Sequence, residues 1–240
     1  MLKEKIYEGK AKILYKSDTD GTIYQYFKDD ATAFNAAKKD SINGKGILNN
    51  YISEFIMNKL VENGVNNHFI KRIDDRVQLV KQLTIVPLEV IVRNQAAGSI
   101  CKRLGLKEAE DFKKPLLEFC YKKDELGDPV ITEDHIELLE LASKDEVAEI
   151  KNITLKINQI LIELFKEANI KLVDFKIEFG RDQDGNVMLA DEISPDSCRL
   201  WDISTGEKMD KDRFRLDLGS LTEYYAEIAN RLNIKLPVLS

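Results

Sequence analysis

The chain has 240 residues, of which 43% are hydrophobic, and it can therefore bury a sizeable core in one large domain or in two unequal ones. Its 36 Lys and Arg are outnumbered by 42 Asp and Glu, and the resulting net charge of −6 argues against binding along a nucleic-acid backbone. This composition also excludes collagen-like and disordered proteins.

The cysteines and the apolar segments exclude two further classes of protein. The 3 cysteines are widely spaced and form no CxxC motif, which argues against a disulfide framework and a structural zinc site. The longest apolar segment, residues 85–92, is interrupted by Pro87 and Glu89, whereas a membrane-spanning helix needs about 20 apolar residues. The N-terminus also lacks the apolar stretch of a signal peptide. We therefore expect a cytoplasmic protein without a membrane-spanning segment.

The N-terminal third predicts strands around one helix. Residues 11–15 and 22–28 are rich in β-branched and aromatic side chains, and the Asp-Gly pair between them is typical of a tight turn. Residues 46–62 then change to the helical spacing of apolar side chains. Residues 68–83 alternate again, as a hairpin would.

The remainder of the chain mixes the two kinds of element. A strand over 88–92 leads into a short helix, and we place a domain boundary near it, between a β-rich domain (1–85) and a larger domain (86–240). Strands followed by mixed strands and helices favour an α+β fold. Ser143 and Glu146 have the spacing of a capping box and predict the start of the longest helix.

Three elements close the chain. Residues 171–180 and 187–193 predict two strands joined by residues 181–186, in which Asp184-Gly185 is a candidate two-residue turn. Residues 220–232 predict a final amphipathic helix.

The first of these two strands carries charges on one face only. Asp174, Lys176 and Glu178 alternate with apolar residues, and a two-residue turn would pair Glu178 with Asp191, with the Cβ atoms roughly 5 Å apart. Mg²⁺ fits between such carboxylates, because it takes one or two of them together with substrate phosphates. A solvent-exposed face neutralised by Lys176 explains the pattern equally well. A shift of one residue in the register would also separate the pair.

Two other groups of residues could bind anions. Arg93 ends a strand just before Gly98 and Ser99 begin a helix, and a guanidinium beside free N–H groups makes a phosphate pocket. The alternative is a Ser cap with Arg93 in a surface salt bridge. Lys10 and Lys12 could cover a phosphate, but charged residues at a strand edge also prevent aggregation.

Motifs of several enzyme classes are absent from the sequence, including the P-loop, the dinucleotide-binding fingerprint, HExxH and GxSxG. The only two histidines, His68 and His135, have no recognisable catalytic context. We expect each of them on the surface or in a loop.

Two segments, residues 84–99 and 172–180, closely resemble the two defining motifs of the SAICAR synthetase (phosphoribosylaminoimidazole-succinocarboxamide synthase) family. Further matches at 8–12, 191–202 and 208–214 extend the resemblance over essentially the whole chain. It implies an ATP-grasp-like α+β fold that holds nucleotide between the two domains. It also implies a ligase of purine biosynthesis that joins L-aspartate to the carboxylate of carboxyaminoimidazole ribonucleotide (CAIR) and converts ATP to ADP and phosphate.

The resemblance further assigns roles to individual residues. Those assigned to ATP are Lys10, Lys12, Lys81, Glu178 and Asp191. The two carboxylates among them would also hold Mg²⁺. Those assigned to the ribonucleotide are Arg93, Ser99, Arg199 and Asn35, the last of which replaces an Asp found in several relatives. Those placed near the reacting groups, as catalytic residues, are Asp174 and Lys176.

The ligation reaction implied by the resemblance does not require a catalytic histidine, and the chain has only two histidines. A carboxylate must be activated before it acylates an amine, and an acyl phosphate made from ATP serves, so the protein needs lysines and Mg²⁺ rather than a nucleophile. A kinase-like phosphotransferase on a related ATP-grasp scaffold would use the same carboxylates. A nucleotide sensor would have no use for Arg93 and Arg199. The sequence leaves open whether copies of the chain form a homo-oligomer.

Overall fold

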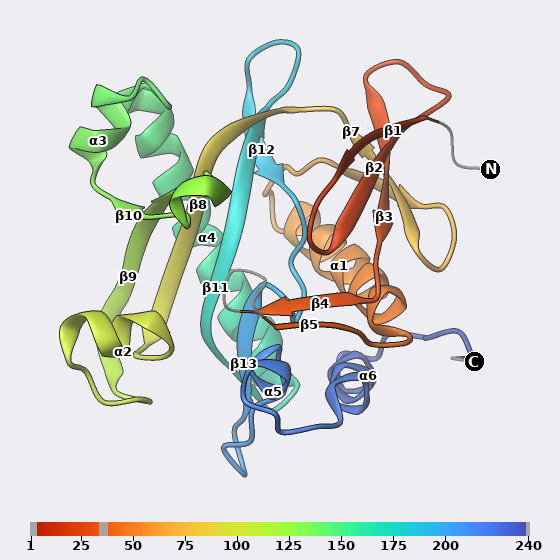
Figure 1. Ribbon diagram of the computed structural model, residues 1–240, viewed down its shortest axis with the longest axis vertical. Coiled ribbons are helices and arrows are strands. Elements are labelled where there is room, and N and C mark those ends of the chain that lie inside the picture. The colour runs from red at the N-terminus through yellow and green to blue at the C-terminus, as the bar shows by residue number, and fades with distance from the viewer. Residues whose placement is uncertain (1–3, 34–37, 239–240) are drawn as a thin grey trace.

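The computed structural model describes residues 4–33 and 38–238. Its first sheet is antiparallel and five-stranded (Figure 1). The strands of this sheet are, in spatial order, β1 (Lys5–Glu8), β2 (Lys12–Lys16), β3 (Thr22–Phe27), β7 (Val77–Lys81) and β6 (Phe69–Arg72). A separate hairpin follows β3 in the chain and consists of β4 (Asp30–Ala33) and β5 (Lys38–Ser41).

The second sheet is larger and also antiparallel. Its strands are, in order, β10 (Val130–Ile131), β9 (Asp111–Tyr121), β8 (Thr84–Gln95), β11 (Ile170–Arg181) and β12 (Val187–Ala190), with β13 (Cys198–Asp202) also paired to β11. The strands β13 and β12 pair with successive parts of β11, 170–175 and 178–181. The chain between them, 191–197, therefore crosses beside the middle of β11.

The helices differ in their role. The main core lies between the larger sheet and two long helices, α1 (Lys45–Glu62) and α4 (Lys144–Glu167). The shorter helices are α2 (Ser99–Leu104), α3 (Glu133–Leu138), α5 (Asp212–Arg215), α6 (Leu221–Arg231) and the 3₁₀ turn η1 (Asp124–Leu126). Among the described residues, no helix is both long and apolar enough to cross a membrane.

Most of the predicted elements are present, and the prediction of an α+β fold is confirmed. The capping box opens α4 as predicted, with the Glu146 N–H donating to Ser143 Oγ at 3.2 Å. The prediction missed the strands β1, β4, β5, β9, β10 and β13 and the short helices η1, α3 and α5, and it made β8 too short. The boundary at 85/86 falls within β8, and α1 packs in the core of the larger sheet. The division into two domains stays a prediction.

Candidate active site

A cavity of about 730 Å³ opens between the two large sheets. Its apolar lining comes mainly from the first sheet and from the start of β8, and includes Leu14, Ile23, Val80, Leu83 and Ile85. Its charged lining includes every residue assigned to ATP by resemblance, namely Lys10, Lys12, Lys81, Glu178 and Asp191. The apolar part of the lining suits a planar base, and the charged part suits phosphates.

A second, smaller cavity of about 200 Å³ adjoins the first. Arg93, Ser99, Asp174 and Arg199 all line it. The residues that line both cavities are Lys176, Asp196, Ser197 and Arg215. Two ligands could therefore meet end to end, with Lys176 at their junction.

The predicted pairing of Glu178 with Asp191 is wrong by one residue. The structure pairs Glu178 with Ala190. The strands are joined by residues 182–186, not by a two-residue turn at Asp184-Gly185, and this loop is closed by the Asp182 N–H donating to the Asn186 carbonyl at 3.1 Å. An odd number of loop residues shifts the register by one position.

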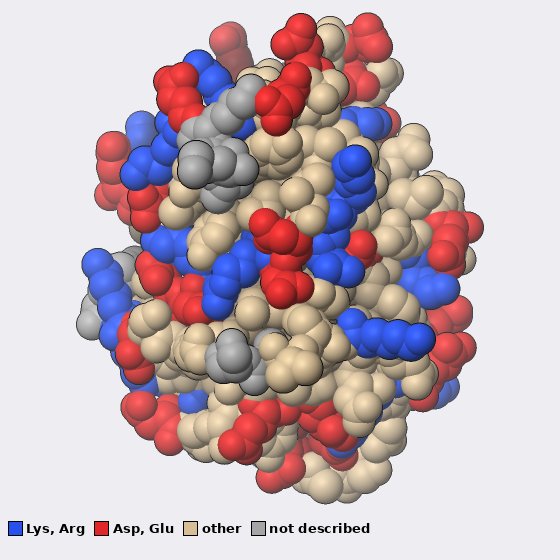
Figure 2. Space-filling view, turned by 90° about the vertical axis from the view of Figure 1, so that its right-hand side faces the viewer, with Lys and Arg blue, Asp and Glu red and all other residues tan. Residues whose placement is uncertain are grey.

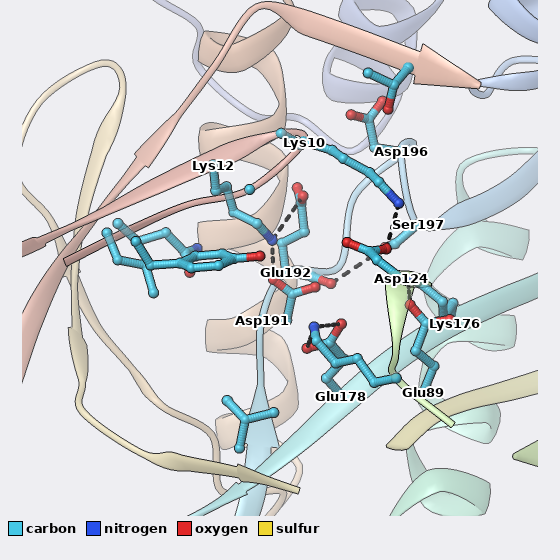
Figure 3. Close-up of a pocket in the computed structure, with 18 of the residues that line it drawn as sticks. Lys10, Lys12, Glu89, Asp124, Lys176, Glu178, Asp191, Glu192, Asp196 and Ser197 are labelled. Carbon is cyan, nitrogen blue, oxygen red and sulfur yellow. Dashed lines mark hydrogen bonds and ion pairs between the residues drawn. The ribbon is translucent and has the colours of Figure 1, made fainter. Parts of the chain in front are cut away.

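The carboxylates of Glu178 and Asp191 nevertheless face the same cavity (Figure 3). Asp191 follows the last residue of β12 and has a φ of 62°, which turns its side chain away from the alternation of the strand. Burial and the charge of Asp191 raise the pKa of Glu178. Burial also acts to raise the pKa of Asp191, but the ion pair with Lys12 outweighs it and lowers the pKa to about 2. Asp191 is therefore ionised at neutral pH.

Lysines hold these carboxylates. Lys12 pairs with Asp191 and, at 3.1 Å, with Glu192, while Lys122 bonds both oxygens of Glu178. Burial acts to lower the pKa of Lys12, but these anions raise it, so the ammonium stays charged. On the face of the molecule shown in Figure 2, basic and acidic side chains are likewise interspersed.

Lys176 pairs with Glu89 across β11 and β8. Burial acts to lower the pKa of Lys176, but Glu89 and Glu178 outweigh it and raise the pKa. Lys176 can thus stabilise negative charge at the junction, but it cannot accept a proton at neutral pH. Lys176 and Glu178 were predicted to share one charged face of β11. That face is the floor of the site rather than a solvent-exposed surface.

The donor set fits Mg²⁺ bound together with phosphates. Glu178 and Asp191 supply two carboxylates, and the buried Oε2 atom of the neighbouring Glu192 has no hydrogen-bond partner among the residues that the structure describes. Within the described part of the chain, no three His, Cys, Asp or Glu side chains are grouped as a metal site. Two carboxylates are enough for Mg²⁺, which completes its octahedron with water and substrate oxygens.

Two arginines that line the smaller cavity, the buried Arg93 and the half-buried Arg199, share one carboxylate. Arg93 donates to Asp174 and Arg199 donates to the same group, each at 2.8 Å. Arg93 also bonds Glu118 at 2.7 Å, and its Nη2 lies 3.4 Å from Ser99 Oγ. The alternative of a surface salt bridge and a Ser cap is wrong, since Arg93 is only 3% exposed and the Ser99 side chain does not cap α2.

Asp174 lies at the centre of this cluster. Burial raises its pKa, while the positive charges of Arg199 and Arg93 act in the opposite direction. The contacts of Asp174 are with the arginines that would grip a phosphate, so the structure gives it an orienting position. Gly98 packs against this cluster, because a Cβ there would lie 2.4 Å from Arg199 Nη2.

Sequence reasoning did not single out three of the residues shared by the two cavities. Ser197 and Arg215 are two of them, and the third is Asp196. It accepts hydrogen bonds from Lys45 and Tyr225, both at 2.7 Å. Burial acts to raise the pKa of Asp196, but Lys45 and Lys211 hold it well below its usual range. Asp196 lies in the matched segment 191–202, and this was its only signal in the sequence. Lys45, in the Gly-Lys-Gly sequence, is fully buried beneath the site.

His68 meets the expectation of a surface or loop position only in part. It lies in the loop before β6, but it is buried and lines the larger cavity, with its Nε2 2.7 Å from the Asp191 carbonyl oxygen. Burial lowers the pKa of His68 to about 4, so the imidazole is neutral at pH 7 and donates through Nε2. His135 is exposed, as expected, and helps to cap α3. Asn35 lies outside the described residues.

Lysines lie beside two carboxylates in one cavity, and arginines line the adjoining cavity. Such a site suits an enzyme that uses a nucleotide to activate a second, phosphorylated substrate. The sequence comparisons define this class more narrowly.

The chain belongs to the SAICAR synthetase family, whose profile matches residues 5–232. A phosphoribosylaminoimidazole-succinocarboxamide synthase of Bacillus subtilis (strain 168) is 57% identical over 229 residues, or 95% of each chain. The enzyme of that name from Maricaulis maris is 58% identical over 232 residues, which cover 95% of this chain and 90% of the relative. The chain is thus a ligase of purine biosynthesis, and the resemblance seen in its sequence is confirmed.

Solved structures agree with this assignment. The crystal structure of the Ehrlichia chaffeensis phosphoribosylaminoimidazole-succinocarboxamide synthase has a TM-score of 0.95 and 51% identity, and the match covers 98% of this chain and 100% of that one. A SAICAR synthetase in complex with ADP has a TM-score of 0.94 and 46% identity over 98% and 99% of the two chains. The predicted SAICAR synthetase fold is therefore confirmed.

Proposed function

We propose that this chain joins L-aspartate to the carboxylate of CAIR and converts ATP to ADP and phosphate by way of an acyl phosphate. The observation that carries this proposal is the junction of the two cavities. One cavity has the lysines and carboxylates that suit a nucleotide, and the other has the arginines that suit a second phosphate. Lys176 lies where the reacting groups of the two ligands would meet.

In the larger cavity, the base would lie against the apolar wall and the phosphates would lie near Lys10 and Lys12. Glu178 and Asp191 would hold Mg²⁺, which supplies positive charge to the transferring phosphoryl group when it is bound. For this, Lys12 would exchange Asp191 for a phosphate oxygen while it keeps its contact with the buried Glu192. Lys81 lines the outer part of the same cavity.

In the smaller cavity, Arg93, Ser99 and Arg199 would bind the phosphate of CAIR and direct its carboxylate toward the junction. A carboxylate oxygen then attacks the γ-phosphorus, and the bond to the β,γ-bridging oxygen breaks to release ADP. The amine of L-aspartate attacks the acyl carbon, and phosphate leaves with the electron pair of the C–O bond. The proton lost from the amine passes to solvent or to phosphate.

Three further statements belong to this proposal. The protein would work in the cytoplasm, it would bind neither nucleic acid nor membrane, and copies of it could assemble into a homo-oligomer. None of the steps above needs a residue from a second chain.

The test is an assay of ADP release combined with mass spectrometry of the products. We expect ADP to form only when CAIR is present, and L-aspartate to be consumed in equal amount. The product should be heavier than CAIR by aspartate less water. A kinase-like phosphotransferase would release ADP without any amine and leave a stable phosphorylated product, and that result would overturn the proposal.

A further inference from the structure

We infer that His68 is a positioning residue, which holds the Asp191 backbone in the conformation that brings the Asp191 carboxylate to Glu178. This inference rests on the proposed function, because it takes these two carboxylates as the metal site. It assigns a role to the one buried histidine of the cavity, for which the proposed reaction has no other use.

The register of the sheet shows why such a residue is needed. Glu178 pairs with Ala190, so these two side chains point to the same face of the sheet. If β12 continued in extended form, the next side chain, that of Asp191, would point to the opposite face, away from Glu178. The left-handed conformation of Asp191, with a φ of 62°, avoids this outcome.

That conformation costs free energy for a residue with a side chain, although Asp tolerates it better than most, and a contact with the surroundings stabilises it. The contact that fixes it comes from His68, whose Nε2 lies 2.7 Å from the Asp191 carbonyl oxygen. A carbonyl cannot donate, so the imidazole is the donor. The hydrogen bond acts on the peptide group that leaves Asp191, which is where the chain turns.

His68 is itself held by the backbone on both sides. Its N–H donates to the Leu189 carbonyl at 2.9 Å, and its carbonyl accepts from the Lys81 N–H at 2.8 Å. Asn67 forms a parallel bridge with Leu189, so this short segment runs beside β12. The imidazole therefore links the first sheet to the backbone of Asp191 at the end of β12.

Two amide variants separate the hydrogen bond from other roles of His68. The side-chain amide of His68→Gln can reach the position of Nε2, whereas that of His68→Asn is one methylene shorter and cannot. The measurement is calorimetric titration with ADP, once with Mg²⁺ and once with EDTA, after thermal melts have confirmed folding. The Mg²⁺-dependent gain in ADP affinity reports on the carboxylates without any need for turnover.

We expect His68→Gln to keep the Mg²⁺-dependent gain in ADP affinity. In His68→Asn this gain should be about tenfold smaller, as is common when a group that orients a metal ligand is removed. In EDTA, both variants should bind ADP like the parent. Loss of affinity in EDTA would mean that His68 contacts the nucleotide, and this would overturn the inference. A full gain in His68→Asn would also overturn it.

Two controls keep this test separate from that of the proposed function. Asp191→Asn should remove the Mg²⁺-dependent gain altogether. If the parent shows no such gain, or Asp191→Asn retains it, the metal assignment fails and the inference falls with it. If His68→Asn does not fold, His68→Gln decides alone, because a folded His68→Gln that binds ADP in EDTA but gains nothing from Mg²⁺ would refute the hydrogen-bond role.

Discussion

Two glycines at the ends of α2 show how a single residue can serve the site. Gly98 and Gly105 both have positive φ values, 65° and 67°, which side chains rarely adopt. They differ in their surroundings. A Cβ on Gly98 would meet the guanidinium of Arg199, whereas a Cβ on Gly105 would meet nothing within 4 Å.

This contrast predicts different effects for the two alanine variants. Gly98→Ala should displace Arg199 and raise the KM for CAIR about tenfold or more, equivalent to about 1.4 kcal/mol of lost binding. Gly105→Ala should lower the Tm through backbone strain of about 1 kcal/mol and leave the KM for CAIR unchanged. Steady-state kinetics and thermal melts on both variants check this. Equal KM values for CAIR would show that the contact between Gly98 and Arg199 has no part in substrate binding.

Arg93→Lys is the second prediction at this scale. Lysine keeps the charge but cannot donate to Glu118, Asp174 and a phosphate in the fixed plane of a guanidinium. The KM for CAIR should rise about tenfold, while that for ATP should change by less than about twofold. Arg103→Lys is the matched control, since Arg103 also bonds Glu118 at 2.7 Å but does not line the cavity. A similar rise in both KM values for Arg93→Lys would indicate general damage to the fold.

At the scale of the elements, the start of a helix was predicted correctly from neighbouring residues, whereas the strand partner of Glu178 was predicted wrongly. The capping box of α4 depends on residues three apart, and it was predicted correctly. The partner of Glu178 depends on the whole loop 182–186, in which the Asp182 side chain accepts the N–H groups of Asp184 and Asn186. No pattern in the strands themselves reveals that loop conformation.

Strand β9 was missed for a different reason. Pro115 and the lysines before it do not resemble a strand of a sheet interior. They are tolerated because β10 pairs only with Phe119 and Cys120, which leaves the first half of β9 at an edge. Arg93 and Ser99 were grouped from their places in the sequence, whereas Arg199 was added to them by the family resemblance alone. Arg199 lies on β13, which has no local link to α2 in the sequence.

The start of α4 predicts a pH dependence of stability. Glu146 accepts the Ser143 N–H and pairs with Arg181, which together lower the pKa of Glu146 to about 2. Because the pKa of Glu146 is lower in the folded state than the value of about 4.3 that a Glu has in the unfolded chain, its ionised carboxylate stabilises the fold at pH values above about 4.3. This stabilisation is lost as the pH falls toward 2.

Glu146→Gln should therefore reduce the free energy of unfolding near pH 7 by a few tenths to about 1 kcal/mol, because the pair is partly exposed. Near pH 2 the variant and the parent should be equally stable. Urea unfolding at several pH values measures this difference. Glu149→Gln, at an exposed position on the same helix, is the control and should show no comparable dependence on pH. A difference that stays constant from pH 7 to pH 2 would contradict the assignment to the ion pair.

At the scale of the whole molecule, the two adjoining cavities predict how substrate binding affects the rate. The phosphate pocket around Arg93 and Arg199 lies apart from the carboxylates that would hold the metal. Binding energy gained from a remote phosphate can be used to orient the reacting carboxylate. CAIR without its phosphate should therefore show a kcat reduced by about tenfold or more, even at saturation. A raised KM with an unchanged kcat would show that the phosphate contributes to binding alone.

The lysines that neutralise the carboxylates also bear on how the protein is made. Two unpaired carboxylates buried side by side would oppose folding, and removal of one partner from a buried ion pair is strongly destabilising. Lys12 and Lys122 supply the compensating charge from within the chain. The folded chain therefore does not need the positive charge of a bound metal to neutralise these carboxylates. Substitutions of Lys12 will consequently reduce the yield of folded protein as well as its activity.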